Sequence, residues 1–308
     1  MVTPGLRGAG TAQRNGPARG EARRRQLRLS ARRYEPRASI AVGTALQGEQ
    51  YMSTIVAPLI EARSESRYFY LYMAGAFILI AFGGFIPTYW APVTTSTFKG
   101  PPILHIHGTL LFSWTVFYFV QTAFVAGRRI MDHRAWGLAG IALFSVLMCS
   151  ILVAQMMVLK RDDALGHGDA SRRFAAVTLC AWPVMAVFFT LAIVNIRKPQ
   201  VQRLMTLLLI NMMTPALARV FLVLLAATAG SAAAGGGPPP PFVAIPPSLV
   251  GDLLLAVAIV HDWRTRGRPH PVYVYGGLVT LGVPFLVTAF ANTGVWMSMA
   301  KAFERLAG

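Results

Sequence analysis

Seven long apolar runs constrain this 308-residue chain more than any other feature of its sequence. A bilayer core about 30 Å thick is crossed by roughly 20 apolar residues in a helix. The runs therefore predict an all-α, polytopic transmembrane helix bundle of about seven spans. The sixth run is the shortest and carries Asp252, so it is the least well defined as a full span. The runs cover approximately residues 68–90, 103–127, 135–159, 174–196, 202–228, 247–263 and 272–299.

The composition excludes a water-soluble domain. Hydrophobic residues make up 55% of the chain and charged residues only 13%, whereas soluble proteins carry roughly 25% charged residues. The excess apolar surface must face lipid, so we expect the lipid bilayer as a partner and no nucleic acid. The two cysteines, Cys149 and Cys180, lie in separate apolar runs. This placement excludes a disulfide framework, a CxxC redox pair and a cysteine zinc site.

The N-terminal segment differs from the rest of the chain. Residues 1–51 contain ten arginines and three glutamates without apolar periodicity, and such a segment cannot bury enough surface to offset its ordering entropy. We predict a disordered basic tail at 1–51, a juxtamembrane segment at 52–67, the seven-helix domain at 68–300 and a short external tail at 301–308. The tail is either a polybasic segment held against anionic lipid or the product of a start codon assigned upstream of Met52.

The loop charges predict the orientation, because short cytoplasmic loops carry the excess of lysine and arginine. The connections after the second, fourth and sixth runs are basic, whereas segment 229–247 at the opposite end carries no charge. Connection 160–173 is the exception, with four cations and three aspartates. We therefore predict a cytoplasmic N-terminus and an external C-terminus. The basic connections contain Arg128, Arg129 and Arg134, then Arg197, Lys198 and Arg203, then Arg264, Arg266 and Arg268.

Polar residues within the spans are the first candidates for a functional site, because ionisable groups there usually mark a site or an ion pair. At a rise of 1.5 Å per residue, five of them from four helices fall at similar depth near the external end. They predict either an externally open pocket that binds an ion, a small ligand or a lipid headgroup, or an Arg219–Asp252 ion pair beside histidines that face water. The five residues are Arg219, Asp252, His105, His107 and Asn292.

No metal-ligand set is assigned from the sequence. His105 and His107 are about 200° apart around a regular helix, so they chelate one ion only if the helix start is unwound. At the cytoplasmic end, His133 and His261 are the best pair in the chain to hold a haem from two helices. The alternative is that both are solvated residues at helix ends, with Trp136 and Trp263 in the interfacial aromatic belt. The cofactor is left open, with a haem or a metal ion as one hypothesis.

Several motifs occur together along the chain: HxHG at 105–108, HRxxG at 133–137 and DWxTRGRxHP at 262–271, with "FGGFIPTYW" and "QVQRLMTLLLI". As a set they resemble a widespread family of uncharacterised bacterial multi-helix inner-membrane proteins, and the resemblance covers nearly everything after residue 68. It implies a multi-pass protein of the bacterial inner membrane and no particular activity. Family members often carry a histidine where this chain has Gln202, so that position offers no haem or metal ligand here.

Three function classes follow from these observations. We expect an integral inner-membrane protein whose external polar cluster binds a small ligand, an ion or a lipid headgroup. The alternatives are a haem- or metal-binding redox protein that uses histidines at helix ends, and a small-molecule transporter, although no convincing repeat relates the two halves. The sequence contains no Walker loop, GxSxG or HExxH motif. Enzymatic activity, the ligand and the oligomeric state are therefore left open.

Overall fold

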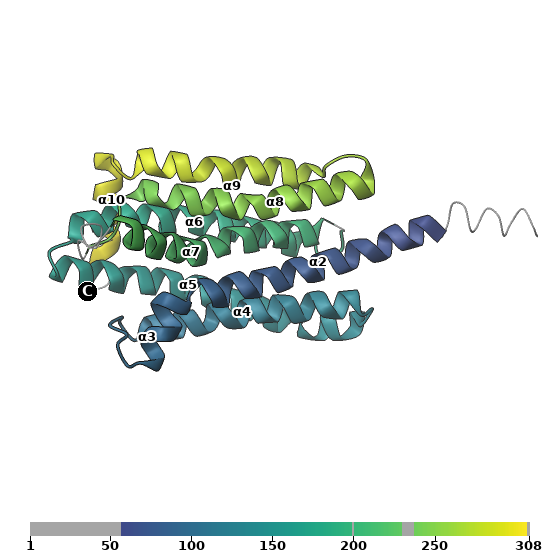
Figure 1. Cartoon of the computed structure of the whole chain (residues 1–308), viewed down its shortest axis with the longest axis horizontal. Coiled ribbons are helices and arrows are strands. Elements are labelled where there is room, and N and C mark those ends of the chain that lie inside the picture. The colour runs from purple at the N-terminus through teal and green to yellow at the C-terminus, as the bar shows by residue number, and fades with distance from the viewer. Residues whose placement is uncertain (1–56, 199, 230–236, 307–308) are drawn as a thin grey trace, which may run out of the picture. The chain divides into compact units, whose positions relative to one another are not determined.

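The structure is a computed structural model that describes residues 57–198, 200–229 and 237–306, and their regular secondary structure is helical (Figure 1). The chain divides into two units at residues 63 and 64. The first unit is described only at 57–63, the first turns of α2. The elements are α2 (Ala57–Gly84), the π-helical turn η2 (Ile86–Trp90), α3 (Ala91–Thr94), α4 (Ile103–Ala126), α5 (Ile130–Ala164), α6 (Gly168–Val194), α7 (Val201–Ala229), the 3-10 turn η4 (Pro241–Ala244), α8 (Ile245–Arg266), α9 (Pro271–Phe290) and α10 (Gly294–Arg305).

Seven helical segments of the described chain are long and apolar enough to cross a bilayer, which confirms the predicted fold class. The sixth segment, Pro241–Arg266, has 26 residues and is long enough to cross in full. Leu79, Leu138 and Leu286 are more than 70% exposed. Side chains of this kind on the bundle surface suit hydrocarbon rather than water. The protein is therefore a multi-pass membrane protein, and the bilayer is its solvent over most of the bundle.

Successive helices pack side by side from α4 to α9, and short turns make neighbours antiparallel (Figure 1). The central helix is α7, which contacts α6, α8 and α9. Four consecutive side chains of α7, Leu207 to Ile210, are at most 2% exposed. Helix α2 also reaches α7, where Gly84 lies against the backbone of Ala216. The turn of α7 from Leu207 to Ile210 is therefore buried on every side and lies in the core of the bundle.

The turns define two ends of the bundle. The arginine-rich end contains the turns at 127–129, 195–198 and 267–270. The proline-rich end contains the turns at 95–102 and 165–167 and the segment 237–244. At the arginine-rich end Gly267 has a φ of 73°, a left-handed conformation that glycine adopts at low cost and that ends α8.

The prediction of one continuous helix over the seventh run was wrong. The seventh run was expected to form one helix over 272–299 followed by a tail, but α9 ends at Phe290 and a separate helix, α10, begins at Gly294. The hydroxyl of Thr293 accepts a hydrogen bond from the backbone N–H of Trp296 at 3.2 Å, which caps the start of α10. Helix α10 then packs against α6 and α5. The juxtamembrane segment 52–67 is helical from Ala57 onward, and the basic tail 1–51 lies outside the described residues.

Candidate functional site

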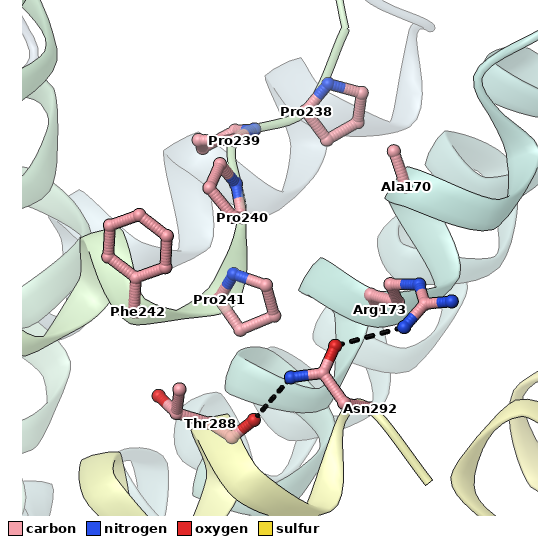
Figure 2. Close-up of a pocket in the computed structure, with 9 residues that line it drawn as sticks. All are labelled: Ala170, Arg173, Pro238, Pro239, Pro240, Pro241, Phe242, Thr288 and Asn292. Carbon is pink, nitrogen blue, oxygen red and sulfur yellow. Dashed lines mark hydrogen bonds between the residues drawn. The ribbon is translucent and has the colours of Figure 1, made fainter. Parts of the chain in front are cut away.

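A pocket of about 410 Å³ lies at the proline-rich end, between α6, α9 and the segment before α8. Its volume lies within the range of small-molecule sites. Figure 2 shows the four prolines and Phe242 on one side of the pocket, with Arg173 and Asn292 on the other. The lining residues are Ala170, Arg173, Pro238, Pro239, Pro240, Pro241, Phe242, Thr288 and Asn292.

The proline wall of the pocket is stiff. Each proline ring fixes φ near −65°, and Pro240 has φ −64° and ψ 149°, an extended conformation. A run of such residues keeps its shape without internal hydrogen bonds. This side of the pocket is therefore preformed, so little conformational entropy is lost when a ligand packs against it.

A chain of hydrogen bonds forms the polar side of the pocket. The guanidinium Nη1 of Arg173 donates to Oδ1 of Asn292 at 2.9 Å, and Nδ2 of Asn292 donates to the carbonyl of Thr288 at 3.0 Å. Among the described residues, no carboxylate lies within ion-pair distance of Arg173. A guanidinium has five N–H donors, so Arg173 keeps donors and an uncompensated positive charge for an anion.

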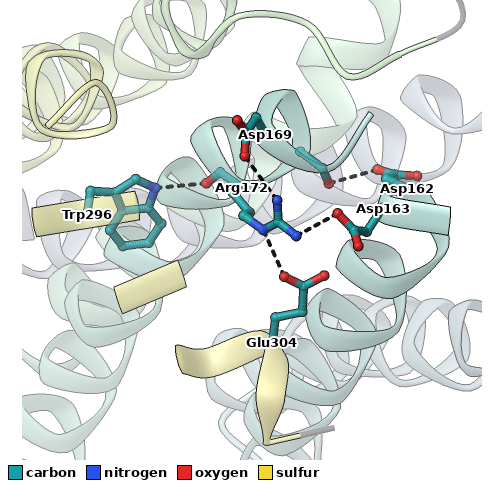
Figure 3. A network of polar contacts seen from close by, with 7 residues as sticks. Asp162, Asp163, Asp169, Arg172, Trp296 and Glu304 are labelled. Atoms are coloured by element: carbon teal, nitrogen blue, oxygen red, sulfur yellow. Dashed lines mark hydrogen bonds and ion pairs between the residues drawn. The ribbon is translucent and has the colours of Figure 1, made fainter. Parts of the chain in front are cut away.

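The neighbouring arginines are neutralised, in contrast to Arg173. Arg172 contacts Asp163 at 2.6 Å, Asp169 at 3.0 Å and Glu304 at 2.8 Å (Figure 3). Arg161 pairs with Asp162 at 2.7 Å. Connection 160–173 was the exception to the predicted loop charges, and these ion pairs neutralise much of its positive charge. From the sequence, Arg173 was counted only as one of four cations in connection 160–173. The sequence does not show which of these arginines has a carboxylate partner.

Of the five side chains predicted to share one external site, His107 and Arg219 lie within electrostatic range of each other, whereas Asp252 lies beside Thr280 and Asn292 beside Arg173. His105 Nδ1 is hydrogen-bonded to the hydroxyl of Tyr89 at 3.0 Å, and His107 Nδ1 to the hydroxyl of Ser150 at 3.0 Å. The two histidines therefore have different partners, as their angular separation on a helix requires. Among the described residues, no group of three or more histidine, cysteine or acidic side chains could hold a metal ion. Of the five, Asn292 lines the pocket.

Arg219 and Asp252 do not form the predicted ion pair. Arg219 lies over the ring of Phe85 at 4.4 Å and donates to the carbonyl of Pro215 at 3.0 Å. Asp252 lies beside Thr280 of α9, and its Oδ2 is buried with no hydrogen-bond partner among the described atoms. The physical reason is rotation. Gly251 of α8 faces Leu217 of α7 where the two helices meet. Around its own helix axis, Asp252 points about 100° away from Gly251, and Arg219 points about 200° away from Leu217.

His133 and His261 are not brought together either. The ring of His261 stacks on Phe69 of α2, with centroids 3.7 Å apart and planes 2° from parallel. His133 is on α5, which packs against α4, α6 and α10, whereas α8 packs against α7, α9 and η4. A haem ligated by both histidines would need the two helices to face one another. The arrangement therefore does not fit the predicted haem pair.

A buried polar cluster at the arginine-rich end was missed. Arg203 and Asp262 form a two-point ion pair in which both side chains are at most 7% exposed. The hydroxyl of Tyr273 donates to that of Tyr70 at 3.4 Å. Gln202, the position where related sequences were expected to carry a histidine, donates to the hydroxyl of Tyr118 at 2.9 Å. Arg203 was counted with the basic connections and Asp262 was noted only as the first residue of the motif at 262–271, although both lie at the ends of predicted apolar runs.

The fold and the pocket define the class of protein: a multi-pass, all-α membrane protein with a small concave site at the proline-rich end of its bundle. Compared with known protein families, curated proteins and solved structures, the chain has no significant match in any of the three. A more specific assignment therefore depends on the residues of the site.

Proposed function

We propose that the protein binds a small amphipathic anion, a carboxylate or phosphate group joined to an apolar body, in the pocket at the proline-rich end. The observation that carries the proposal is Arg173, which faces a concave apolar wall without a carboxylate partner among the described residues. Arg173 is partly buried beside the pocket, and a partly buried charge is stabilised by an opposite charge close to it. A bound anion would supply that charge.

The geometry also supports the kind of ligand. The guanidinium of Arg173 and the amide of Asn292 suit the oxygens of a carboxylate or phosphate, which accept hydrogen bonds in two directions. The prolines and Phe242, which is 58% exposed, offer an apolar surface for the remainder of the ligand. We therefore expect an anion with a hydrocarbon portion to bind more tightly than inorganic phosphate alone.

The proposal includes the location and orientation of the protein. We place it in the bacterial inner membrane with the arginine-rich end in the cytoplasm and the pocket open to the outside. Support comes from the basic turns at the arginine-rich end. Lysine and arginine are more numerous in the turns at the arginine-rich end than in those at the proline-rich end, as the positive-inside rule requires of a cytoplasmic end.

Binding of decanoate and of inorganic phosphate to the full chain in phosphatidylcholine nanodiscs tests the ligand. Calorimetry should detect decanoate binding that Arg173→Gln weakens by at least tenfold and Phe242→Ala weakens by less, because a charge-assisted hydrogen bond contributes roughly 1.5–3 kcal/mol. Arg161→Gln is the matched control, since Arg161 lies at the same end outside the pocket. Equal decanoate affinity in the wild type and Arg173→Gln would overturn the proposed site.

Cysteine labelling in spheroplasts tests the orientation independently. With Cys149 and Cys180 replaced by alanine, Thr97→Cys in an exposed turn at the proline-rich end should react with an impermeant maleimide. Arg266→Cys, exposed at the other end, should react only after the membrane is opened. The reverse pattern would place the pocket in the cytoplasm.

A further inference from the structure

Helix α10 has three distinct faces, because its residues recur at helical spacing. The buried face contains Trp296 and Ala300, which are 3% and 1% exposed and pack in a cluster with Leu159 of α5 and Ala176 of α6. The exposed faces are an apolar stripe and a basic stripe. The apolar stripe contains Val295, Met299, Ala302 and Leu306; the basic stripe contains Lys301 and Arg305 beside it.

The rotation of α10 about its own axis is fixed at both ends. Near its start, the indole Nε1 of Trp296 donates to the backbone carbonyl of Arg172 at 2.8 Å. Near its end, Glu304 accepts from the Nε of Arg172 at 2.8 Å. Figure 3 shows Arg172 between these two contacts, with Asp163 and Asp169 on its other donors. The outward direction of the apolar stripe is therefore imposed by the fold.

The apolar stripe has no protein cover in the structure. Val295, Met299 and Leu306 are 65%, 53% and 78% exposed. The seventh candidate span is α9, which ends at Phe290, and α10 begins four residues later at Gly294. It therefore starts at the membrane boundary, where an exposed apolar stripe can enter the region between headgroups and acyl chains.

The basic stripe indicates which class of lipid covers the apolar stripe. Lys301 and Arg305 are exposed, and neither has a carboxylate within ion-pair distance among the described residues. Cationic side chains beside an apolar stripe are attracted to anionic headgroups. We infer that α10 is an interfacial helix that inserts Val295, Met299 and Leu306 into the leaflet at the proline-rich end and binds anionic phospholipid through Lys301 and Arg305.

Spin-label accessibility in nanodiscs tests the insertion. In the full chain with Cys149 and Cys180 replaced by alanine, labels are placed at Met299→Cys in the stripe and at the adjacent exposed Ser298→Cys outside it. The Met299 label should be relaxed more by oxygen, which concentrates in hydrocarbon, and the Ser298 label more by a water-soluble nickel chelate. Equal nickel accessibility at the two positions would show that α10 lies in water and would overturn the inference.

Lipid selectivity tests the headgroup. The full chain is purified from membranes of equal parts phosphatidylcholine and phosphatidylglycerol, and the retained lipid is measured by mass spectrometry. Phosphatidylglycerol should be enriched, and the Lys301→Gln, Arg305→Gln double variant should lose that enrichment several-fold. The pocket variant Arg173→Gln should retain it, which separates this surface from the proposed pocket. Loss in Arg173→Gln with no change in the double variant would assign the lipid to the pocket and overturn the inference.

Discussion

The carboxylate of Asp262 receives two hydrogen bonds from the guanidinium of Arg203 and a third from the backbone N–H of His270 at 3.2 Å. Arg203 belongs to α7 and Asp262 to α8, while His270 precedes α9. One carboxylate therefore joins three helices at the arginine-rich end. The ring of Tyr273 lies against the same guanidinium, with its centroid 5.9 Å from Cζ.

Removing one member of this pair should destabilise the protein strongly. Arg203→Met or Asp262→Leu leaves the other charge buried and unpaired, which costs about 3–5 kcal/mol. The double variant should recover much of that loss. Denaturant unfolding in mild detergent measures all three variants. The control is the Arg129–Asp132 pair, whose side chains are 64% and 43% exposed, and its removal should cost about 0–1 kcal/mol. Strictly additive losses for Arg203 and Asp262 would contradict a coupled pair.

The stability of the protein should fall in mild acid because of His270. Burial, followed by the nearby Arg203 and Arg266, lowers the pKa of His270 below its usual value, although Asp262 opposes the shift and Arg268 adds to it. The unfolded chain then binds more protons than the folded chain in this range, so the contribution is complete above about pH 6.5 and is lost as the pH falls toward the lower folded pKa. Protonation would also remove the acceptor that caps α9, since His270 Nδ1 accepts from the backbone N–H of Val272 at 3.2 Å.

Unfolding free energies between pH 7.5 and 5.5, about one unit on either side of the free histidine pKa, measure this effect. His270→Asn keeps a capping oxygen and should reduce the loss on acidification. His105→Asn, at the opposite end of the bundle, controls for the removal of a histidine. An unchanged pH dependence in His270→Asn would show that other groups cause the loss.

The sequence predicted the spans well but not the Arg219–Asp252 pair, for a physical reason. Seven apolar runs fix the number of spans because their length must match the bilayer, and the observed helices begin within about six residues of the predicted starts from the second span onward. Rise per residue then predicts depth, but it does not predict the direction in which a side chain points. Arg219 and Asp252 have similar predicted depths and face different neighbours.

Other features required knowledge of tertiary partners. Arg172 and Arg173 are adjacent in sequence, yet one contacts three carboxylates and the other none among the described residues. The start of α10 did have a local signal. Thr293 followed by Gly294 interrupts the apolar run and provides a helix N-cap, but the hydrophobicity of the surrounding residues concealed it.

Release of α10 should follow from the loss of Glu304. The Glu304 side chain is 13% exposed and pairs with Arg172 at 2.8 Å. Glu304→Gln keeps an acceptor oxygen but removes the charge, so it should weaken the attachment by about half of the ~1.5–3 kcal/mol that a hydrogen bond between charged groups contributes. Amide hydrogen exchange over residues 294–305 should then accelerate, while exchange in α7 stays slow. Asp169→Asn is the control, because Asp169 contacts the same arginine but is 70% exposed. Equal acceleration in both variants would mean that Glu304 has no special role in holding α10.

The contact between α2 and α7 should depend on the absence of a side chain at residue 84. A Cβ added to Gly84 would lie 2.5 Å from the backbone oxygen of Ala216, and the rigid helix backbone cannot yield as a side chain can. Gly84→Ala should therefore cost about 1–3 kcal/mol, as overpacking of a filled interior does. At the adjacent Gly83, a Cβ would meet nothing within 4 Å. Gly83→Ala should be neutral or stabilising by up to about 1 kcal/mol through helix propensity. Thermal unfolding in detergent compares the two variants, and equal melting temperatures would contradict the close approach of α2 and α7 at this position.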